Sequence, residues 1–480
     1  MATHTAVDTA HNFDPTILRS YDIRGQVGKT LSATDAYFIG ASFGEYVQGR
    51  KAQNEAAKIA VGRDGRLTSP EMATALIDGL VFAGCQVTDI GVGPTPMLYF
   101  ADRHLECDGA IQVTGSHNPP DHNGFKIIYD HQSFFGEDIQ KLGEMSAAGI
   151  SGLEGGTRTA HSVFDAYIAR IMKAADFGDM HIVWDAGNGA AGPATDAIIA
   201  RASGTHKALF TDIDGHFPNH HPNPVDPKTL AMLRDEVIQA GADCGIGFDG
   251  DGDRIGVVDA KGRHIAGDIL TAYLGLEILK LHPGSDIIFD VKSSLSAMAL
   301  ITQAGGQAHL WKTGHSHMKA RLKQMQAPLA GEMSGHIFIA DDYFGFDDAL
   351  FVAVRLIACM VRQKQLTGKS LTDFVDQLPA IYATPECHIA CSDTLKFGVI
   401  EKLARQFAEH LPASQINLTD GVRITTEAGW CLIRASNTEA ALVVRAEGQD
   451  PDALDSFVTL IKDQIGQAGV VWDGPQKNVP

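Results

Sequence analysis

Three aspartates at alternate positions are the residues whose chemistry is clearest. The loop Asp249-Gly250-Asp251-Gly252-Asp253 connects two apolar runs, 244–248 and 255–258, which we expect to be strands. Carboxylates at this spacing repel one another unless a cation lies between them, and oxygen-only ligands suit a hard ion such as Mg2+. An EF-hand is excluded, because Arg254 and Ala260 stand where it needs glycine and glutamate. The loop predicts a metal site, with a solvated Asp-Gly turn as the alternative.

A serine at the end of another expected strand is the second candidate for chemistry. Residues 110–120 predict a strand that ends in a turn around Ser116, and a second strand is expected at 124–128. Gly115 and the prolines that follow would hold Ser116 out on a stiff loop. The Gly-x-Ser-x-Gly pattern of acyl-transfer enzymes is missing there. A plain hairpin turn is the alternative.

Two further patterns have alternatives that we favour over the functional interpretation. Residues 187–192 match the dinucleotide fingerprint, with Asp212 or Asp214 as the ribose-binding acid, and would indicate a nicotinamide-dependent oxidoreductase. A tight turn that lets a helix pack closely is the favoured interpretation. His220 and His221 lie in a proline-rich segment and could be metal ligands, but loop geometry is the better explanation for them.

These candidates require elements that position them, and most of the chain predicts βα units. Three segments repeat an apolar run, a glycine- or serine-rich turn and a helical pattern, which is typical of α/β domains. In the first, Ser69-Pro70 would cap the helix. The runs are 58–61, 182–184 and 286–291, and the second and third helices are expected to continue through Ile199 and Ile301.

The last hundred residues change in character. Strands are expected at 422–425, 430–434 and 441–446, followed by a helix at 452–464 that closes an α+β domain. Segment 366–380 is the expected hinge. We therefore expect four domains, three of them α/β, at residues 1–155, 156–260, 261–372 and 373–480.

Composition excludes several classes of protein. The chain has 480 residues with 58 acidic and 39 basic side chains, and its net charge of −19 argues against binding nucleic acid or anionic membranes. Seven scattered cysteines indicate reduced thiols in the cytoplasm. The longest apolar stretch, 349–361, is interrupted by Arg355 and predicts a core helix rather than a membrane span. The polar start of the chain does not resemble a secretory signal.

Four motifs together resemble those of the α-D-phosphohexomutase superfamily, most closely its bacterial phosphomannomutase/phosphoglucomutase members. They occur in the family's order from Ser116 to Thr438, which is nearly the whole chain. The resemblance implies three similar α/β domains with mixed sheets and a C-terminal α+β domain around a central cleft. The motifs are Thr114-Gly115-Ser116-His117-Asn118-Pro119, the Asp249 to Arg254 loop, Gly331-Glu332-Met333-Ser334-Gly335-His336 and Arg434-Ala435-Ser436-Asn437-Thr438.

The resemblance also implies roles for individual residues. Ser116 would be a phosphoserine whose phosphate completes the Mg2+ site with Asp249, Asp251 and Asp253, and Arg254 would face the transferring phosphoryl group. Lys126 and His315 match positions near the proton transfer, and either could be the general base. Arg24, expected to be catalytic, and Tyr21 match a segment of the cleft. A surface histidine at 315 and a surface turn around Tyr21 are the alternatives.

A second group of residues would bind the substrate. Glu332 and Ser334 match sugar-reading positions, and Lys292 and His336 would line the same cleft. The distal phosphate is expected at a cluster of guanidinium, hydroxyl and amide donors. That cluster consists of Arg434, Ser436, Asn437 and Thr438.

The function implied is a cytoplasmic mutase that interconverts hexose 6-phosphate and hexose 1-phosphate for mannose and glucose. A hexose 1,6-bisphosphate would be both the bound intermediate and the activator, and the chain would be a monomer or weak dimer. Phosphoglucosamine mutase is the alternative within the superfamily, but those enzymes usually carry alanine at the position of Gly115 and glutamine at that of Met333. A non-catalytic phosphosugar-binding protein and the oxidoreductase are more distant alternatives.

Overall fold

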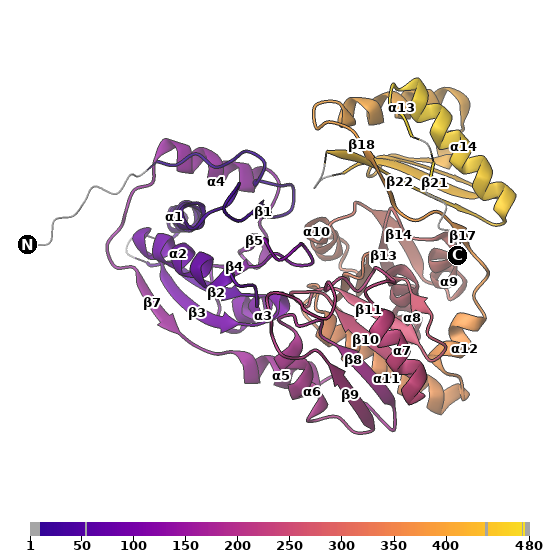
Figure 1. The fold of residues 1–480 in the computed structure, drawn as a ribbon, viewed down its shortest axis with the longest axis horizontal. Coiled ribbons are helices and arrows are strands. Elements are labelled where there is room, and N and C mark those ends of the chain that lie inside the picture. Colours follow the sequence, from indigo (N-terminus) through magenta and orange to yellow (C-terminus); the bar gives the residue numbers. More distant parts are fainter. Residues whose placement is uncertain (1–9, 53–54, 437–439, 473, 476–480) are drawn as a thin grey trace, which may run out of the picture. The chain divides into compact units, whose positions relative to one another are not determined.

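The computed structural model describes residues 10–52, 55–436, 440–472 and 474–475. The chain forms two compact units, one of Met1–Leu270 with Ser334–Phe374 and one of Thr271–Met333 with Val375–Pro480. Figure 1 shows helices packed beside the sheets in both units.

The first sheet of the first unit is mixed, in the order β1-β5-β4-β2-β3-β7 with β6 beside β5. β2 runs parallel to β3 and β4, whereas β5 is antiparallel to β4 and β1. Its strands are β1 (Ile23–Gln26), β2 (Lys58–Arg63), β3 (Gln86–Val92), β4 (Gly109–Val113), β5 (His122–Tyr129), β6 (Gln132–Ser133) and β7 (Thr157–Ala160), and its helices are α1 (Ala33–Gln48), α2 (Ser69–Phe82), α3 (Thr95–His104) and α4 (Glu137–Ala148).

The register of this sheet positions two candidate site residues. Arg63 of β2 pairs with Val113 of β4, so the segments that follow these parallel strands leave the sheet at the same edge. β4 then turns back into β5, where Lys126 pairs with Gln112. The turn that carries Ser116 therefore connects β4 to β5, the strand that carries Lys126.

The helix α2, which follows β2, begins at Ser69, although Ser69 was predicted to be the N-cap residue just before the helix. Thr68 is the N-cap residue of α2, and Ser69 and Pro70 lie in the first turn. The prediction that Ser69 caps the helix is wrong, because its hydroxyl donates to Asp64 Oδ1 at 2.5 Å instead. This hydrogen bond joins residues only five positions apart, so the Ser69 hydroxyl is used within the segment that leads into α2 rather than as the helix cap.

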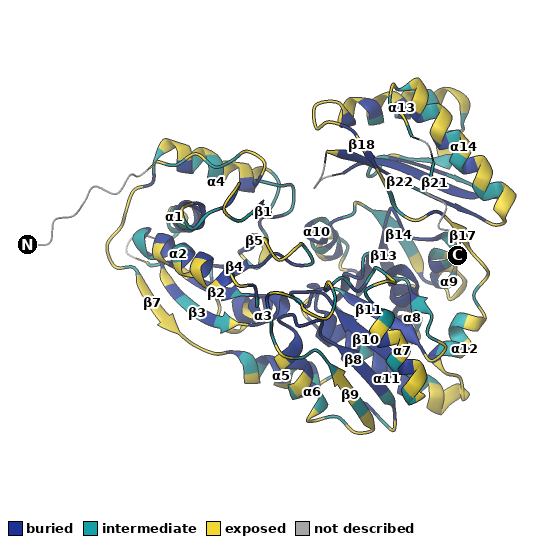
Figure 2. Ribbon diagram, in the orientation of Figure 1, coloured by how far each residue is buried: buried dark blue, intermediate teal, exposed yellow. Residues whose placement is uncertain are grey.

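The second sheet has the order β12-β11-β10-β8-β9 and is also mixed. The predicted strands on either side of the Asp249 to Asp253 loop are confirmed as the antiparallel pair β10 and β11. Figure 2 shows β10 buried while α7 has an exposed face. The elements are β8 (His181–Asp185), β9 (Thr205–Leu209), β10 (Cys244–Phe248), β11 (Ile255–Asp259), β12 (His264–Ile265), α5 (Phe164–Met172), α6 (Gly192–Ile199) and α7 (Ala231–Ala240).

The fingerprint-like turn before α6 is a packing turn, as favoured from the sequence. A Cβ atom on Gly192 would lie 1.9 Å from the carbonyl oxygen of Thr211. Only glycine allows the helix to start this close to the neighbouring backbone. The contact explains the glycine without a bound dinucleotide.

The first unit also contains β16 (Ile337–Ile339) and the long helix α11 (Ala349–Thr367). The core helix predicted at 349–361 is confirmed, since every residue of that stretch except Arg355 is buried. Among the described residues, none of the helices combines the length and apolarity that a membrane span needs. α8 (Gly267–Leu281) and α12 (Leu371–Asp376) cross from one unit's residues into the other's.

The second unit begins with parallel strands. β13 pairs with β14 and with β15, and the predicted strand at 286–291 is β13. These elements are β13 (Asp286–Asp290), β14 (Gln307–Trp311), β15 (Leu329–Gly331), α9 (Leu295–Gln303) and α10 (His315–Met325).

The C-terminal sheet of the second unit is antiparallel, in the order β17-β22-β21-β20-β19 with β18 beside β22. The predicted α+β character is confirmed, but the sequence interpretation missed α13, whose buried face is Val399, Leu403 and Phe407. The elements are β17 (Tyr382–Ala383), β18 (Cys387–Ala390), β19 (Ile416–Asn417), β20 (Val422–Thr426), β21 (Gly429–Ala435), β22 (Ala441–Gly448), α13 (Lys396–His410), the short 3-10 helix η1 (Ala413–Gln415) and α14 (Pro451–Gln467).

Candidate functional site

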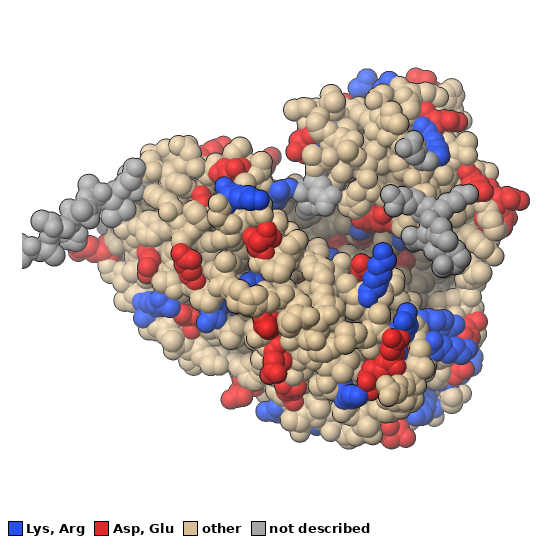
Figure 3. Space-filling view, viewed as in Figure 1, with Lys and Arg blue, Asp and Glu red and all other residues tan. Residues whose placement is uncertain are grey.

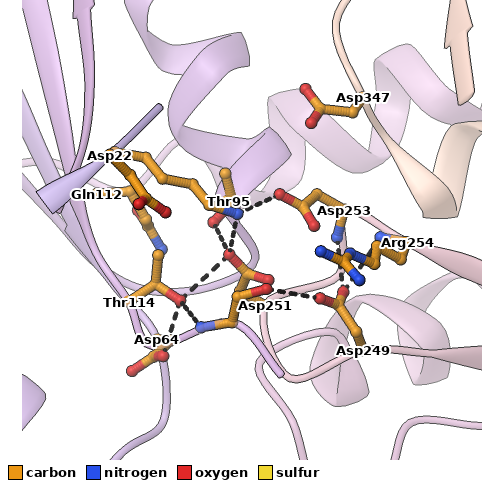
Figure 4. A network of polar contacts seen from close by, with 12 residues as sticks. Asp22, Asp64, Thr95, Gln112, Thr114, Asp249, Asp251, Asp253, Arg254 and Asp347 are labelled. Atoms are coloured by element: carbon orange, nitrogen blue, oxygen red, sulfur yellow. Dashed lines mark hydrogen bonds and ion pairs between the residues drawn. The ribbon is translucent and has the colours of Figure 1, made fainter. Parts of the chain in front are cut away.

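The loop between β10 and β11 gathers three buried carboxylates. Asp249, Asp251 and Asp253 are all 0% exposed, and each offers an oxygen within 4.8 Å of the others (Figure 4). Asp249 Oδ1 accepts hydrogen bonds from the backbone N–H groups of Asp253 at 3.0 Å and Arg254 at 3.1 Å, which closes the loop on itself. Gly252 adopts a φ of +72°, a conformation that favours glycine. The local sequence therefore folds into the cluster that its aspartate spacing predicted.

Ser116 lies directly against this cluster. Its hydroxyl donates to Asp249 Oδ2 at 3.0 Å, and its backbone N–H donates to Thr114 Oγ1 at 2.9 Å. The residue is 1% exposed, so the expectation of a serine displayed on an exposed loop is wrong. The Asp249 to Asp253 loop covers it, since a Cβ on Gly250 would lie 2.5 Å from the Ser116 carbonyl oxygen.

The backbone of Ser116 is in the left-handed region, with a φ of 49°. A residue other than glycine in that region costs on the order of 1–3 kcal/mol, and such conformations persist where the surroundings determine them. The cost in stability is consistent with a loop whose conformation serves to direct the serine hydroxyl toward Asp249.

Lys126 of β5 supplies positive charge to the carboxylates. Its ammonium group donates to Asp251 Oδ2 at 2.8 Å and also contacts Asp253. Asp251 Oδ2 accepts a further hydrogen bond from Thr95 Oγ1 at 2.6 Å, and Thr114 Oγ1 lies 3.1 Å from it. Burial opposes the charge of Lys126, but the attraction of the three aspartates outweighs it, so the pKa of Lys126 is raised.

One ammonium group does not keep all three carboxylates ionised. Burial works against the charge of Asp251, but Lys126 more than compensates and lowers the pKa of Asp251. Burial and then the charge of Asp251 raise the pKa of Asp253 to about 7, and burial also raises that of Asp249. A divalent cation would remove this penalty.

The cluster fits a hard cation on a further ground. Asp251 Oδ1 and Asp253 Oδ1 are buried and have no hydrogen-bond partner among the described residues. Buried carboxylate oxygens without a partner are costly unless a cation takes them as ligands. The donor set is all oxygen, as Mg2+ prefers. Asp253 also forms a second grouping with His336 and Asp347, whose ligand atoms lie within 4.8 Å of one another.

Arg254 is held by His336 in that second grouping. Arg254 Nε donates to His336 Nε2 at 2.7 Å, and His336 Nδ1 lies 3.4 Å from Asp347 Oδ2. This geometry assigns the ring proton of His336 to Nδ1, because Nε2 accepts the hydrogen bond. The sequence interpretation placed His336 with the sugar and missed Asp347, for which the sequence offers no signal beyond its residue type.

Arg24 of β1 contacts the turn that carries Ser116, which we call the serine loop. Its guanidinium donates to Asn118 Oδ1 at 2.5 Å and to Asp22 Oδ2 at 2.5 Å. Burial disfavours the charge, but the attraction of Asp22 outweighs it and the pKa of Arg24 is raised. Tyr21 is half-buried just before β1. Arg24 thus lies beside the turn that carries Ser116, and its catalytic role stays a prediction.

His117 is a site residue that the sequence interpretation missed. Its Nδ1 lies 3.1 Å from Ser116 Oγ. Burial, with the nearby charges of Arg254 and Arg24, lowers the pKa of His117 well below 6.5, so the ring is neutral. Its position next to Ser116 in the sequence was the available signal.

His220 is explained by its contact with Asp185 at the end of β8. His220 Nε2 lies 2.9 Å from Asp185 Oδ2, and burial is outweighed by this contact so that the pKa of His220 is raised. Neither His220 nor His221 belongs to a group of potential metal ligands among the described residues. The favoured interpretation, loop geometry, agrees with these contacts.

The second unit holds most of the predicted substrate-binding residues. Glu332 follows β15 and accepts from the backbone N–H of Gly314 at 2.5 Å, directly before His315, the buried first residue of α10. Lys292 Nζ pairs with Glu386 at 2.9 Å. Ser334 is half-buried and belongs by residue number to the first unit. The backbone before α10 therefore brings Glu332 and His315 together.

The predicted phosphate-binding loop is described in part. Arg434 Nε donates to Asp420 Oδ2 at 3.0 Å, and the Ser436 carbonyl accepts from Lys396 Nζ at 2.5 Å. Asn437 and Thr438 lie outside the described residues. Lys396, 4% exposed at the start of α13, was missed because α13 itself was missed.

Comparison with known proteins places this architecture in context. Four consecutive family models, all described as phosphoglucomutase/phosphomannomutase, match residues 15–148 (alpha/beta/alpha domain I), 165–262 (domain II), 266–382 (domain III) and 357–464 (C-terminal domain). The expected fold class, three α/β domains with mixed sheets and a C-terminal α+β domain, is confirmed.

Individual relatives cover nearly the whole chain. A phosphomannomutase/phosphoglucomutase of Pseudomonas aeruginosa is 41% identical over 94% of this chain and 95% of its own length. A crystal structure of a phosphoglucomutase/phosphomannomutase family protein from Burkholderia thailandensis superposes with a TM-score of 0.88 at 37% identity, covering 97% of this chain and 100% of that one. An Aspergillus fumigatus N-acetylphosphoglucosamine mutase, solved with GlcNAc-6P and magnesium, shares the fold at 14% identity and a TM-score of 0.57, over 89% of this chain and 80% of that one.

Proposed function

The chain belongs to the phosphoglucomutase/phosphomannomutase family of hexose phosphate mutases, and we propose that it interconverts the 1- and 6-phosphates of mannose and glucose through a phosphoserine at Ser116. The observation that carries the proposal is the hydrogen bond of 3.0 Å from the Ser116 hydroxyl to the three-carboxylate cluster. A serine buried among acids, with cations nearby, suits a phosphate carrier better than a solvent-exposed turn.

The proposed reaction moves one phosphoryl group at a time. The free hydroxyl of a hexose phosphate attacks the phosphorus of phospho-Ser116, the bond from phosphorus to Ser116 Oγ breaks, and the hydroxyl proton passes to a base. The product is a hexose 1,6-bisphosphate, which turns end for end. Its other phosphoryl group then passes to Ser116 Oγ, and the freed sugar oxygen takes up a proton. Hexose 1,6-bisphosphate from solution would also activate the enzyme, by phosphorylating an unmodified Ser116.

The metal proposed for this site is Mg2+. Asp249, Asp251 and Asp253, with an oxygen of the Ser116 phosphate, would hold it. When bound, the ion supplies charge neutralisation for the transferring phosphoryl group. The buried, unpartnered oxygens of Asp251 and Asp253 support the assignment. Magnesium bound in the related Aspergillus fumigatus mutase is consistent with it.

Charged residues of the first unit would assist the transfer. Arg254, oriented by His336, is proposed to face the phosphoryl group, and Arg24, at the serine loop, to contact the substrate with Tyr21. Lys126 and His315 are the candidates for the base. The raised pKa of Lys126 supports a charge-balancing role for the lysine and favours His315 as the base.

Residues mostly of the second unit are proposed to bind the sugar and the distal phosphate. Glu332 and Ser334 would accept and donate hydrogen bonds at the sugar hydroxyls, with Lys292 and His336 beside them. The distal phosphate would take donors from one loop, where a guanidinium and several hydroxyl and amide groups cluster. That loop contains Arg434, Ser436, Asn437 and Thr438.

The alternative of a phosphoglucosamine mutase is less well supported at Gly115. A Cβ atom there would lie 2.4 Å from Arg66 Nε and 2.7 Å from the His122 carbonyl oxygen. The alanine typical of glucosamine enzymes would therefore collide with its surroundings in this chain. The collision distinguishes this chain from the glucosamine enzymes at that position.

The test of the covalent step is the variant Ser116→Ala, with the exposed Ser203→Ala as its matched control. After incubation with glucose 1,6-bisphosphate, intact mass should show one added phosphoryl group on the wild-type and Ser203→Ala proteins and none on Ser116→Ala. Ser116→Ala should also lose most mutase turnover while its thermal unfolding stays cooperative. Turnover near the wild-type level in a verified Ser116→Ala protein would rule out the phosphoserine mechanism.

A further inference from the structure

The motif Gly62-Arg63-Asp64-Gly65-Arg66 spans the end of β2 and the loop after it, and it has no role in the function proposed so far. Its last residue, Arg66, is 1% exposed and is among the largest fully buried side chains of the described residues. Because β2 and β4 are parallel neighbours, the motif lies at the edge of the sheet from which the Ser116 turn emerges. A buried guanidinium at this place requires partners.

The partners of Arg66 are backbone carbonyls of the serine loop. Arg66 Nη2 donates to the carbonyls of Ser116 at 2.7 Å and Asn118 at 2.6 Å. Arg66 Nη1 donates to those of Pro119 at 2.6 Å and His122 at 3.1 Å. One planar side chain therefore satisfies four carbonyls of a single turn, including that of Ser116 itself.

Asp64 holds the beginning of the same turn. Its Oδ2 accepts from Thr114 Oγ1 at 2.9 Å (Figure 4), and it also accepts from the Gly115 backbone N–H at 3.0 Å. The same oxygen lies 3.2 Å from Arg66 Nε, so the two side chains form one ion pair behind the turn. The serine loop is thus held along its length by two residues of the motif.

The conformation of Ser116 explains why such support is needed. Its φ of 49° is strained for serine, and it is this conformation that accompanies the hydroxyl contact with Asp249. The adjoining carbonyl of Ser116 accepts from Arg66, which restricts rotation of the peptide that follows. Without that hydrogen bond the turn would relax toward ordinary backbone angles, and the hydroxyl would move.

We propose that Arg66, oriented by Asp64, is a positioning residue that holds the Ser116 turn in its strained conformation and thereby aims the serine oxygen for phosphoryl transfer. The inference rests on the proposed phosphoserine function. Most of its contacts are to neutral carbonyls, so the geometry of the guanidinium matters as well as its charge. Lysine, with one nitrogen, cannot span the same four carbonyl oxygens.

The principal variant is therefore Arg66→Lys, which keeps the charge and removes the planar donors. Its matched control is Arg63→Lys in the same motif, because the half-buried Arg63 side chain makes no hydrogen bond or ion pair recorded for the described residues. A second variant, Gly115→Ala, leaves Arg66 in the chain but places a methyl group 2.4 Å from its Nε. It reaches the same turn by an independent route if Arg66→Lys fails to fold.

Two quantities separate positioning from general stability. Intact mass after rapid mixing of dephosphorylated protein with glucose 1,6-bisphosphate gives the rate at which Ser116 is phosphorylated. Calorimetric titration with glucose 1-phosphate gives the dissociation constant, which is expected to depend mainly on Glu332 and the Arg434 loop. For Arg66→Lys we expect phosphorylation at least about 100-fold slower, since small misplacements of reacting atoms have effects of that size. Glucose 1-phosphate binding should stay within about threefold of wild type, and Arg63→Lys should match wild type in both measurements.

Three outcomes would overturn the proposal. In the first, folded Arg66→Lys is phosphorylated within about threefold of the wild-type rate, which shows that the turn needs no guanidinium. In the second, binding and phosphorylation fall together, which indicates a general structural role. In the third, Arg66→Lys does not fold, and Ser116 of the Gly115→Ala protein is phosphorylated at the wild-type rate. Failure of the wild-type protein itself to accept a phosphoryl group would instead contradict the phosphoserine function on which the proposal depends.

Discussion

At the scale of single residues, the acidic loop is a problem of charge that Lys126 solves only in part. The ammonium contacts Asp251 and Asp253, yet the pKa of Asp253 is still raised to about 7 by burial and by the charge of Asp251. The cluster is therefore built with more negative charge than the protein neutralises. A bound cation would supply the remainder.

The variant Asp251→Asn tests this balance. Removing the charge of Asp251 should lower the pKa of Asp253, because that charge is one of the causes that raise it. Lys126 then keeps an ionised partner in Asp253, which it already contacts. We expect the Tm to change by less than about 5 °C. The Mg2+ concentration for half-maximal activity should rise at least about tenfold, because a ligand is lost.

Activity titrated with Mg2+ and a thermal melt provide the two measurements for Asp251→Asn. The exposed Asp179→Asn serves as the control for loss of one negative charge. Global unfolding of Asp251→Asn, together with an unchanged Mg2+ response of its residual activity, would mean that the loop is structural.

At the scale of elements, the start of α11 is joined to α5 through one buried carboxylate. Asp348 is the N-cap residue of α11 and accepts from the Phe351 backbone N–H at 3.0 Å. It also accepts from the hydroxyls of Tyr167 in α5 at 3.0 Å and Tyr343 at 2.8 Å. Despite these hydrogen bonds, burial raises the pKa of Asp348 to about 6.

This shift predicts how stability depends on pH. A carboxyl whose pKa is higher in the folded than in the unfolded chain stays protonated to a higher pH when folded. Its contribution to the free energy of unfolding is therefore fully present below about pH 4 and is lost as the pH rises through about 6. A difference of about two units corresponds to about 3 kcal/mol at most. The free energy of unfolding should therefore fall between pH 4 and pH 7 on account of Asp348.

Asp348→Asn removes that titration, so its unfolding free energy should depend less steeply on pH over the same range. Denaturant unfolding at several pH values measures the slopes, and the exposed Asp235→Asn should keep the wild-type slope. Identical slopes in the wild-type and Asp348→Asn proteins would show that folding does not raise the pKa of Asp348.

At the scale of the whole molecule, the proposed chemistry draws on both units. Ser116 and the carboxylate cluster belong to the first unit, and Glu332 and Arg434 belong to the second. The chain carries a net charge of −19, and the face in Figure 3 shows acidic and basic side chains interspersed. Positive charge for the proposed anionic substrate would therefore have to be local, at buried groups such as Arg434 and Lys292.

The proposed end-for-end turn of the bisphosphate predicts the sugar specificity of the enzyme. One phosphate loop must hold the 1-phosphate in one pose and the 6-phosphate in the other, and the O3 and O4 hydroxyls roughly exchange places between them. In the proposed site, Glu332 and Ser334 would bind both poses by contacting that pair, which would leave O2 without a specific partner. Mannose and glucose differ only at C2, so transition-state binding should differ by about 1 kcal/mol or less.

We therefore expect kcat/KM for mannose 1-phosphate and glucose 1-phosphate to agree within about tenfold, and the 3-deoxy and 4-deoxy sugars to react far more slowly. Competition between the two substrates in a single reaction measures the ratio directly. A preference of about a hundredfold or more would show that a residue contacts O2 and that this account of the site is incorrect.

The sequence by itself determined what depends on local order. Alternating aspartates between two apolar runs became a carboxylate cluster between β10 and β11, and the apolar stretch at 349–361 became a buried helix. The four motifs predicted the family, and the comparisons confirmed it. The domain boundaries, the central cleft and the roles of individual site residues stay predictions. Such motifs can be recognised in a sequence because their residue types and spacing follow from the chemistry that they perform.

Tertiary structure alone decided how those motifs are supported. Arg66 and Asp64 contact a turn about 50 residues away, and Arg254 contacts a histidine 82 residues away. Ser116 proved buried, because the Asp249 to Asp253 loop from another sheet covers it. Strand register brings such distant residues together. Because a buried polar group must find a partner wherever the fold places one, these pairings follow from packing and cannot be inferred from spacing along the chain.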